Sequence, residues 1–407
     1  MLFRSNMIPI AGRPLEGVRV IAVEQYGAGP HSTMQLADLG AEVIKIENAS
    51  DGGDVGRHVR HANEQLPKGD SLFFQSFNRG KRSTSLNLKS DEGQEAFRRL
   101  AATADAVFNN LRGDIPSKLG LTYESLKSVN SRLVCVHLSA YGREGARSAW
   151  PGYDFLMQAE CGYLSVTGEK GGPPSRMGLS IVDLSTGLQA ALALVSGVIG
   201  ARATGKGGDY DVSLFDVAMT NLCYAGSWYL NLGEKIGREE RSAHPNLVPS
   251  QLYKTGDGWI FLMCNKEKFW PVLCSCIAKP QWGSDKRFAT FSDRLTNRDL
   301  ITRLLDEVLS KKTTAEWMEI FAGAVPAAPV NDVAQALNSE FLHSTDQIIE
   351  YRTPSGTTIR SVGPGIRQPG IKPRSDPAPV LAADQKIIFG DLGYTPEEAE
   401  ALAGHTH

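Results

Sequence analysis

The 407-residue chain lacks most of the short motifs that assign a protein to a function class directly. It has no GxSxG nucleophile elbow, no HExxH zinc motif and no GxxxxGK(S/T) phosphate loop. Its six cysteines include no CxxC pair, and no His/Cys spacing matches a zinc site. We therefore expect buried thiols and no bound metal.

The chain also lacks an excess of charge and a long apolar run. Its 43 basic and 45 acidic residues give a net charge of −2, which offers no electrostatic attraction to nucleic acid or an anionic membrane. The N-terminal MLFRSNMIPIAGRPLEG has no long apolar core typical of a secretory signal. The most apolar long segment, 188–201, is short for a bilayer span and is typical of a buried helix. We expect a cytoplasmic protein without a membrane or nucleic-acid partner.

Alternating strand and helix patterns fill the first 150 residues. Short β-branched runs predict strands at GVRVIAVE (17–24), AEVIKIE (41–47), DAVFNNL (105–111) and RLVCVHLSAYG (132–142). Helical patterns separate them, so the segment is predicted as an α/β layer with a parallel sheet. Ligand-binding loops are expected at the carboxyl ends of the strands.

The sequence pattern changes after about residue 230. QLYKTGDGWIFLMCN (251–265) predicts a hairpin, and helical patterns follow at 268–278 and 297–324. GPGIRQPGIKPRSDPAP (363–379) is typical of an extended connector, and TPEEAEALAG of a short capped helix. These patterns predict a second, smaller α+β domain.

Two cationic segments are candidate phosphate sites. FNRGKRSTSLNLK (77–89) concentrates four cations and is either a solvated loop or a site for anions; NNLRGDIPSKLGL (109–121) places Arg112 and Lys118 just after a strand. Gly27 and Gly29 lack the third glycine of a dinucleotide fingerprint, because position 32 is Ser. Two cationic loops at strand ends favour a polyphosphorylated small molecule over NAD or a long nucleic acid.

The carboxylate of Asp154, in the segment PGYD, has two interpretations. It either caps a helix that begins with FLMQAECG, or it acts as a nucleophile.

As a set, and in this order and spacing, AGP after the first strand, ADLGAEVIKIE, FNRGKRS, NNLRGDIPSKLGL and PGYD resemble the class III CoA-transferase family. That family includes formyl-CoA transferase and is related to the α-methylacyl-CoA racemases. The resemblance covers roughly 15–225 and the last 30 residues. It implies an α/β protein with a Rossmann-like large domain built from both chain ends, a smaller α+β domain, and two ring-like subunits interlocked into a homodimer. The expected boundaries are a large domain over 1–205, a linker over 206–232, a small domain over 233–335, and a linker with return to the large domain over 336–407.

The resemblance also implies the substrates and their contacts. An acyl-CoA and a free carboxylic acid are the expected partners, with CoA entering as part of the substrate and no permanently bound cofactor. The residues that match the family's CoA contacts are Gly27, Ala28, Leu86, Asn87, Lys89, Asn110, Leu111, Arg112, Lys118, Ser139 and Ala140. The chain departs from the family at Asn48 and Lys118, where Arg is common, and it has no glycine run typical of the mobile lid of formyl-CoA transferase.

Asp154 matches the family's catalytic aspartate. The implied reaction forms an aspartyl anhydride and then an aspartyl-CoA thioester. A racemase is the alternative; there a His precedes this aspartate, whereas this chain has Tyr153, although Asp183 matches the racemases' second carboxylate. The candidate acyl-pocket residues are Tyr26, His31, Arg79, Tyr153 and His244.

Overall fold

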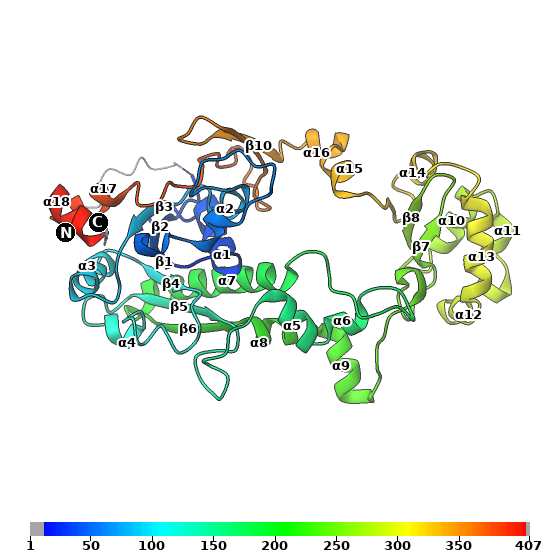
Figure 1. Ribbon diagram of the computed structural model, residues 1–407. Helices are drawn as coiled ribbons and strands as arrows, with labels where there is room; N and C mark the ends of the chain where they lie inside the picture. The colour runs from blue at the N-terminus through cyan, green and yellow to red at the C-terminus, as the bar shows by residue number, and fades with distance from the viewer. Residues whose placement is uncertain (1–11, 404–407) are drawn as a thin grey trace. The chain divides into compact units, whose positions relative to one another are not determined.

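The structure is a computed structural model that describes residues 12–403. These residues form two compact units (Figure 1). The first unit comprises 12–161, 178–222 and 345–403, and the second comprises 162–177 and 223–344. The first unit is therefore assembled from segments near both ends of the chain.

A six-stranded parallel sheet forms the centre of the first unit, in the order β3-β2-β1-β4-β5-β6. Its strands are β1 (Arg19–Val23), β2 (Glu42–Glu47), β3 (Arg82–Ser85), β4 (Ala106–Asn109), β5 (Val134–Ser139) and β6 (Gly208–Ser213). The direction of strand addition reverses between the neighbours β1 and β4. In open α/β sheets, ligands bind beyond the carboxyl ends of the strands at such a reversal.

The structure confirms the predicted strands β1, β2, β4 and β5 and adds β3, which the sequence did not predict. The β3 sequence, RSTS, contains no apolar residue, so it gave no strand signal and fell within the cationic segment 77–89. Its buried hydroxyls are satisfied by hydrogen bonds; Ser83, for example, donates to Glu47 at 2.6 Å. The range 206–232, expected as a linker, instead supplies β6 to the sheet.

Helices from all three segments of the first unit surround this sheet. They are α1 (Ala28–Asp38), α2 (Leu72–Asn78), α3 (Asp91–Ala101), α4 (Tyr123–Leu126), α5 (Asp154–Glu160), α7 (Ile181–Thr204), α8 (Leu214–Thr220), α17 (Gln385–Gly390) and α18 (Pro396–Leu402), with the short 3₁₀ turns η1 (Ala49–Asp51) and η2 (Val55–His58). A hairpin of β10 (Ile348–Arg352) and β11 (Thr358–Val362) precedes the extended connector. Phe389 and Leu402 join Ile21, Ile44 and Phe97 in one apolar core, so the C-terminal helices stabilise the sheet formed earlier in the chain.

Helix α7 is the longest element of the first unit and is only partly buried. It spans 24 residues, and its most apolar window has a mean hydropathy of 1.6 with 44% of that window buried. By length and composition alone it could cross a membrane, a test that a core helix of a globular protein also passes. It packs on α1 and on strands β5 and β6, while Leu188, Leu192 and Ile199 stay more than half exposed.

The second unit has its own sheet and core. Its antiparallel strands are β7 (Ser250–Lys254), β8 (Trp259–Met263) and β9 (Ala327–Pro329), and the first two form the hairpin predicted at 251–265. Its helices are α6 (Tyr163–Val166), α9 (Cys223–Leu232), η3 (Glu240–Ser242), α10 (Phe269–Cys276), α11 (Pro280–Gly283), η4 (Lys286–Phe288), α12 (Phe291–Thr296), α13 (Arg298–Leu309), α14 (Thr314–Phe321), α15 (Val333–Leu337) and α16 (Glu340–His343). Trp270, Phe288, Leu305 and Phe321 lie in its apolar core.

Candidate active site

A cavity of about 190 Å³ lies in the first unit at the carboxyl ends of β1, β4 and β5. It is lined by residues 25–28, 110–112, 138–140 and 150–153, with Asp183 and Leu214. Asn110 joins two of these strand ends, because its amide accepts from the Gln25 N–H at 2.9 Å and donates to the Gln25 carbonyl at 2.8 Å. Gly29 packs against this amide: a Cβ at Gly29 would lie 2.6 Å from Asn110 Cγ, so a side chain there would displace Asn110.

The carboxylate of Asp154 is 4% exposed and is held by a different helix from its own. Asp154 is the first residue of α5, and the N-cap residue is Tyr153, which makes no side-chain cap hydrogen bond. Asp154 Oδ2 accepts the backbone N–H groups of Val182 at 2.6 Å and Asp183 at 2.9 Å, in the first turn of α7. Asp154 Oδ1 accepts from Gln158 Nε2 at 2.6 Å. The carboxylate thus occupies the positive end of the α7 dipole.

A second carboxyl group, that of Asp183, lines the cavity, whereas Asp154 lies between the lining residue Tyr153 and the backbone N–H of Asp183. Burial, and then the negative charge of Asp154, raise the pKa of Asp183 from 3.8 to about 7. Asp183 Oδ2 would lie 3.0 Å from a Cβ at Gly27, so a larger residue at position 27 would press on this carboxyl. Sequence comparison with the racemases singled out Asp183; its place in the first turn of α7, beside the nucleophile candidate, comes from the fold.

A family model described as CoA-transferase family III matches residues 15–385. The chain belongs to CoA-transferase family III. It is a class III CoA-transferase enzyme, as its motifs indicated.

Relatives of this CoA-transferase cover nearly its whole length. It is 31% identical over 391 residues to the succinate–glutarate CoA-transferase of Agrobacterium fabrum, which covers 93% of this chain and 96% of that protein. It is 34% identical over 328 residues to the acetyl-CoA:oxalate CoA-transferase of Acetobacter aceti, covering 80% and 82% of the two chains. The crystal structure of a CAIB/BAIF family protein from Brucella suis matches with a TM-score of 0.78 at 32% identity, covering 93% of this chain and 99% of that one.

The structure divides the predicted CoA-contact residues of this transferase into two groups. Seven line the cavity: Gly27, Ala28, Asn110, Leu111, Arg112, Ser139 and Ala140. The other four do not line it. Leu86 is buried, whereas Asn87, Lys89 and Lys118 are exposed. Leu86, Asn87 and Lys89 directly follow β3, so they also lie beyond the carboxyl end of a strand.

The two cations of the loop after β4 share one carboxylate. Arg112 Nε lies 2.5 Å from Asp114 Oδ1, and Lys118 Nζ lies 2.7 Å from Asp114 Oδ2. Hydrogen bonds from Arg112 and Lys118 hold the pKa of Asp114 well below its usual range. Both cations remain about half exposed or more, so they are accessible to an anionic ligand.

Three of the four cations in segment 77–89 are paired inside the fold and are not open to a phosphate, whereas Lys89 is exposed. Arg79 makes two hydrogen bonds to Asp38, at 3.0 and 2.5 Å. Lys81 Nζ lies 2.7 Å from Glu24 Oε1, and burial lowers the pKa of Lys81 to about 8. Arg82 pairs with two carboxylates on neighbouring elements. The sequence shows the cations but not their distant acidic partners, which the sheet brings beside them.

The candidate acyl-pocket residues are similarly divided. Tyr26 and Tyr153 line the cavity, whereas Arg79 is buried in its ion pair. His31 packs edge-on against Phe77; burial first, and then two nearby cations, lower the pKa of His31 to about 4. His244 belongs to the second unit.

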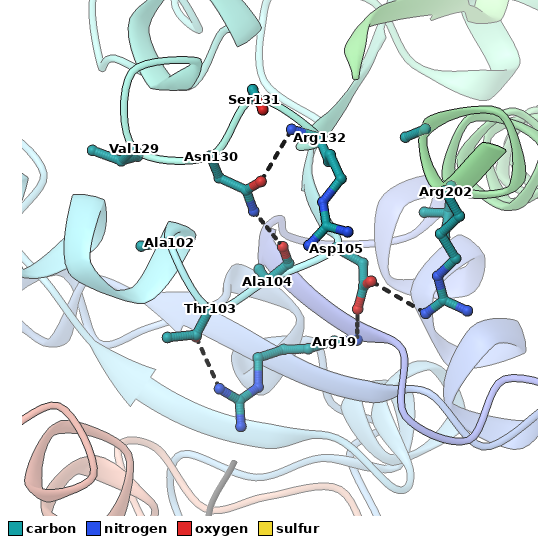
Figure 2. A pocket seen from close by; sticks show the side chains of 12 residues that line it. Arg19, Ala102, Thr103, Ala104, Asp105, Val129, Asn130, Ser131, Arg132 and Arg202 are labelled. Atoms are coloured by element: carbon teal, nitrogen blue, oxygen red, sulfur yellow. Dashed lines mark hydrogen bonds and ion pairs between the residues drawn. The ribbon is translucent and has the colours of Figure 1, made fainter. Parts of the chain in front are cut away.

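Another cavity, of about 690 Å³, lies at the amino ends of strands β1, β4 and β5 (Figure 2). Its lining includes Arg19 at the start of β1, Asp105 before β4 and Arg202 in the last turn of α7. Asp105 accepts the Arg19 backbone N–H at 2.9 Å and pairs with Arg202 at 3.2 Å, as the dashed lines in Figure 2 show. Because strands begin here, this cavity is separate from the candidate active site.

Proposed function

We propose that this enzyme moves CoA from an acyl-CoA thioester to a free carboxylic acid through covalent intermediates on Asp154. The observation that carries the proposal is the pair of backbone N–H groups from α7 that fix one oxygen of a buried carboxylate beside a cavity at the strand reversal. The family membership supports the same reaction.

In the first step we assign the attack to the Asp154 oxygen that is held by fewer hydrogen bonds. Asp154 Oδ1 is held by one side-chain amide, that of Gln158, whereas Oδ2 is held by two backbone donors in a helix. In the proposed step Oδ1 attacks the thioester carbonyl carbon. The C–S bond breaks, the CoA thiolate leaves with its electron pair, and an aspartyl acyl anhydride forms.

The second step uses the two N–H groups as an oxyanion site. The CoA thiolate attacks Cγ of Asp154, and negative charge develops on Oδ2, where Val182 and Asp183 already donate at 2.6 and 2.9 Å. The bond from Cγ to the anhydride oxygen then breaks, which releases the first acid and leaves an aspartyl-CoA thioester. The acceptor carboxylate repeats these steps in reverse. Because the thioester is conserved throughout, the exchange needs no ATP.

The substrates are proposed from the named relatives. The relatives named above act on succinate and glutarate or on acetyl-CoA and oxalate. A mass-spectrometric screen of acyl-CoA donors against free acids, beginning with these, identifies the pair.

The proposal extends to assembly and location. We infer a homodimer of interlocked ring-like subunits in the cytoplasm. The exposed apolar stripe of α7 supports self-association, since such a stripe costs free energy in water.

The nucleophile is tested by trapping. Succinyl-CoA or acetyl-CoA followed by hydroxylamine is expected to convert one carboxyl, that of Asp154, into a hydroxamate found by peptide mass spectrometry. Asp154→Ala and Asp154→Asn are expected to lose at least about 10³-fold in kcat, because removing a covalent nucleophile removes the lowest-barrier path. Asp91→Ala is the matched control, because Asp91 is the first residue of α3 and exposed.

Two results would contradict the proposal. One is a hydroxamate on another carboxyl while Asp154 stays unmodified. The other is substantial turnover by Asp154→Asn, which is the outcome expected if the residue only holds the first turn of α7. Deuterium exchange at Cα of the acyl group as fast as thioester exchange would favour the racemase alternative instead.

A further inference from the structure

The proposed reaction leaves one polar group of the cavity without a role, the carboxyl of Asp183. Within residues 12–403 this carboxyl accepts no hydrogen bond and forms no ion pair, although the backbone N–H of the same residue holds Asp154. It lines the cavity and packs against Gly27. A carboxyl that faces a cavity without a protein partner is available to a ligand.

The chemical state of Asp183 follows from its neighbour. The negative charge of Asp154 disfavours a second negative charge on Asp183, so the pair is more stable when one of the two carboxyls carries a proton. Burial and the charge of Asp154 raise the pKa of Asp183 to about 7, so it holds a proton over the acidic side of neutrality. A protonated carboxyl is a hydrogen-bond donor, whereas an ionised one only accepts.

We propose that protonated Asp183 donates a hydrogen bond to the carboxylate of the acid substrate as that acid leaves or attacks Asp154. The inference rests on the function proposed above and adds an acid-binding residue to it. The hydrogen bond stabilises the departing or arriving anion near the negative charge of Asp154. No proton is transferred, since Asp183 keeps its proton throughout. Ionised Asp183 repels the same anion.

Other charged and titratable groups around Asp183 are few. Tyr26, Tyr153 and Arg112 line the same cavity from three different segments, and Arg112 is paired with its own carboxylate. His31 of α1 packs against α7 at Gly187, where an added Cβ would lie 3.2 Å from the imidazole ring. Burial, and then two nearby cations, lower the pKa of His31 to about 4. His31 therefore stays neutral where Asp183 titrates.

The test compares Asp183→Asn, which keeps a donor that cannot ionise, with Asp183→Ala, which has none. Succinyl-CoA with glutarate is the probe, and acetyl-CoA with oxalate serves if that pair turns over instead. In wild type, KM for the acid is expected to rise roughly tenfold per pH unit above about pH 7, as the protonated fraction falls. Asp183→Asn is expected to remove this rise. Asp183→Ala is expected to raise KM for the acid about tenfold at about pH 6, the loss of one hydrogen bond to a charged group, and to leave KM for the acyl-CoA within threefold.

A stability measurement shows independently of turnover whether Asp183 titrates. Its folded pKa is raised, from 3.8 to about 7, so the folded state binds its proton more tightly than the unfolded state. The stability this contributes is fully present below about pH 4 and is lost as the pH rises through 7. The Tm of Asp183→Asn minus that of wild type is therefore expected to increase between about pH 5 and about pH 8. Asp91→Asn is the control, with a difference that stays flat.

The outcomes separate this inference from the proposed function. A wild-type KM for the acid that ignores pH, or an Asp183→Ala variant that binds the acid normally, overturns the role of Asp183. A Tm difference that does not change with pH overturns it as well. The hydroxylamine test on Asp154 remains valid in each Asp183 variant. A labelled Asp154 together with unaffected acid binding would contradict the role of Asp183 and leave the role of Asp154 intact.

Discussion

Asp154 does not act as the cap of its own helix, because it accepts hydrogen bonds from the N–H groups of another helix. A capping side chain bonds the N–H groups of the helix that it begins, whereas Asp154 bonds those of α7. The arrangement removes the carboxylate from water and fixes one oxygen in place. Sequence alone allowed either role, because the spacing of 28 and 29 residues to the two donors follows from the tertiary packing of α5 on α7.

Phosphate recognition by this enzyme is predicted to depend on Arg112 and Lys118. Replacing either by Ala is expected to weaken CoA binding about tenfold, because each removes a hydrogen bond to a charged group. Asp114→Asn is expected to strengthen binding modestly, because it releases both cations from their shared carboxylate. Isothermal titration with CoA measures each change. Lys127→Ala is the control, because Lys127 is an exposed cation paired with a carboxylate on α4.

Unchanged CoA affinity in both the Arg112 and Lys118 variants would move the phosphate site away from this loop. Loss of affinity in the Lys127 control as well would mean that overall charge, rather than these two contacts, governs binding. Higher ionic strength is expected to reduce the effect of each substitution, since all three cations are at least 45% exposed.

The sequence could predict much of the site at the level of residues. Asp154 and the loops around Gly27 and Asn110 were recognised from motifs in their order, and the structure places these loops around one cavity. It could not assign Val182 as a donor, because a backbone N–H leaves no trace in residue identity. Gln158 carried no signal for a different reason: its side-chain amide faces Asp154 only one helical turn along α5, and a glutamine there is equally compatible with an exposed position.

Among the elements, β3 shows how ion pairs replace apolar packing. The strand and the residues before it carry three cations, and the fold brings acidic residues from α1, from β2 and from the position after β1 beside them. Removing water from these charges is costly, so the pairs persist only because each cation has a carboxylate within hydrogen-bond distance. This explains why 77–89 resembled a ligand loop in sequence: cations and hydroxyls mark both kinds of segment.

We predict that Arg79→Ala destabilises the fold rather than weakening CoA binding. The substitution leaves Asp38, which is 5% exposed, without the guanidinium that makes two hydrogen bonds to it. Breaking one side of a buried pair costs about 3–5 kcal/mol. Urea unfolding measures the loss. Arg98→Ala, which removes an exposed pair with Glu95 on α3, is the control and is expected to leave the stability nearly unchanged.

A variant of Arg79 that keeps wild-type stability but loses CoA affinity would show that the ion pair is not the residue's main role.

Prediction from sequence was most successful for elements with apolar periodicity, such as the 251–265 hairpin and the capped helix α18. β6 lies in the range expected as a linker, because nothing in its sequence shows that it pairs with β5 rather than ending the domain.

At the scale of the whole molecule, the first unit is completed only when the chain returns to it at residues 345–403. The C-terminal helices bury Phe389 and Leu402 in the core formed by the earlier strands, and Gln385 bonds the β3 backbone. The resemblance implied this return, whereas the order of residues alone could not. The small unit also includes 162–177, which periodicity gave no reason to separate from the segments on either side.

The exposed stripe on α7 leads to the prediction about assembly. Leu188, Leu192 and Ile199 lie four and seven residues apart in turn, so they share one face, and they are 51%, 61% and 64% exposed. The opposite face packs in the first unit, and no described residue of that unit covers the stripe. A second copy of this chain covers it in the dimer that we propose.

We expect a dimer whose mass stays constant on dilution, because interlocked rings cannot separate while both stay folded. Sedimentation measured from micromolar to nanomolar protein tests this directly. The double variant Leu192→Asp and Ile199→Asp is expected to prevent assembly, since it buries two charges in an apolar interface. Gln189→Asp places a charge beside the stripe at an exposed polar position, so it is expected to stay dimeric. A mass that falls with dilution would contradict interlocking while leaving a dimer, whereas a wild-type monomer at every concentration would contradict the dimer itself, and the α7 stripe would then require another partner.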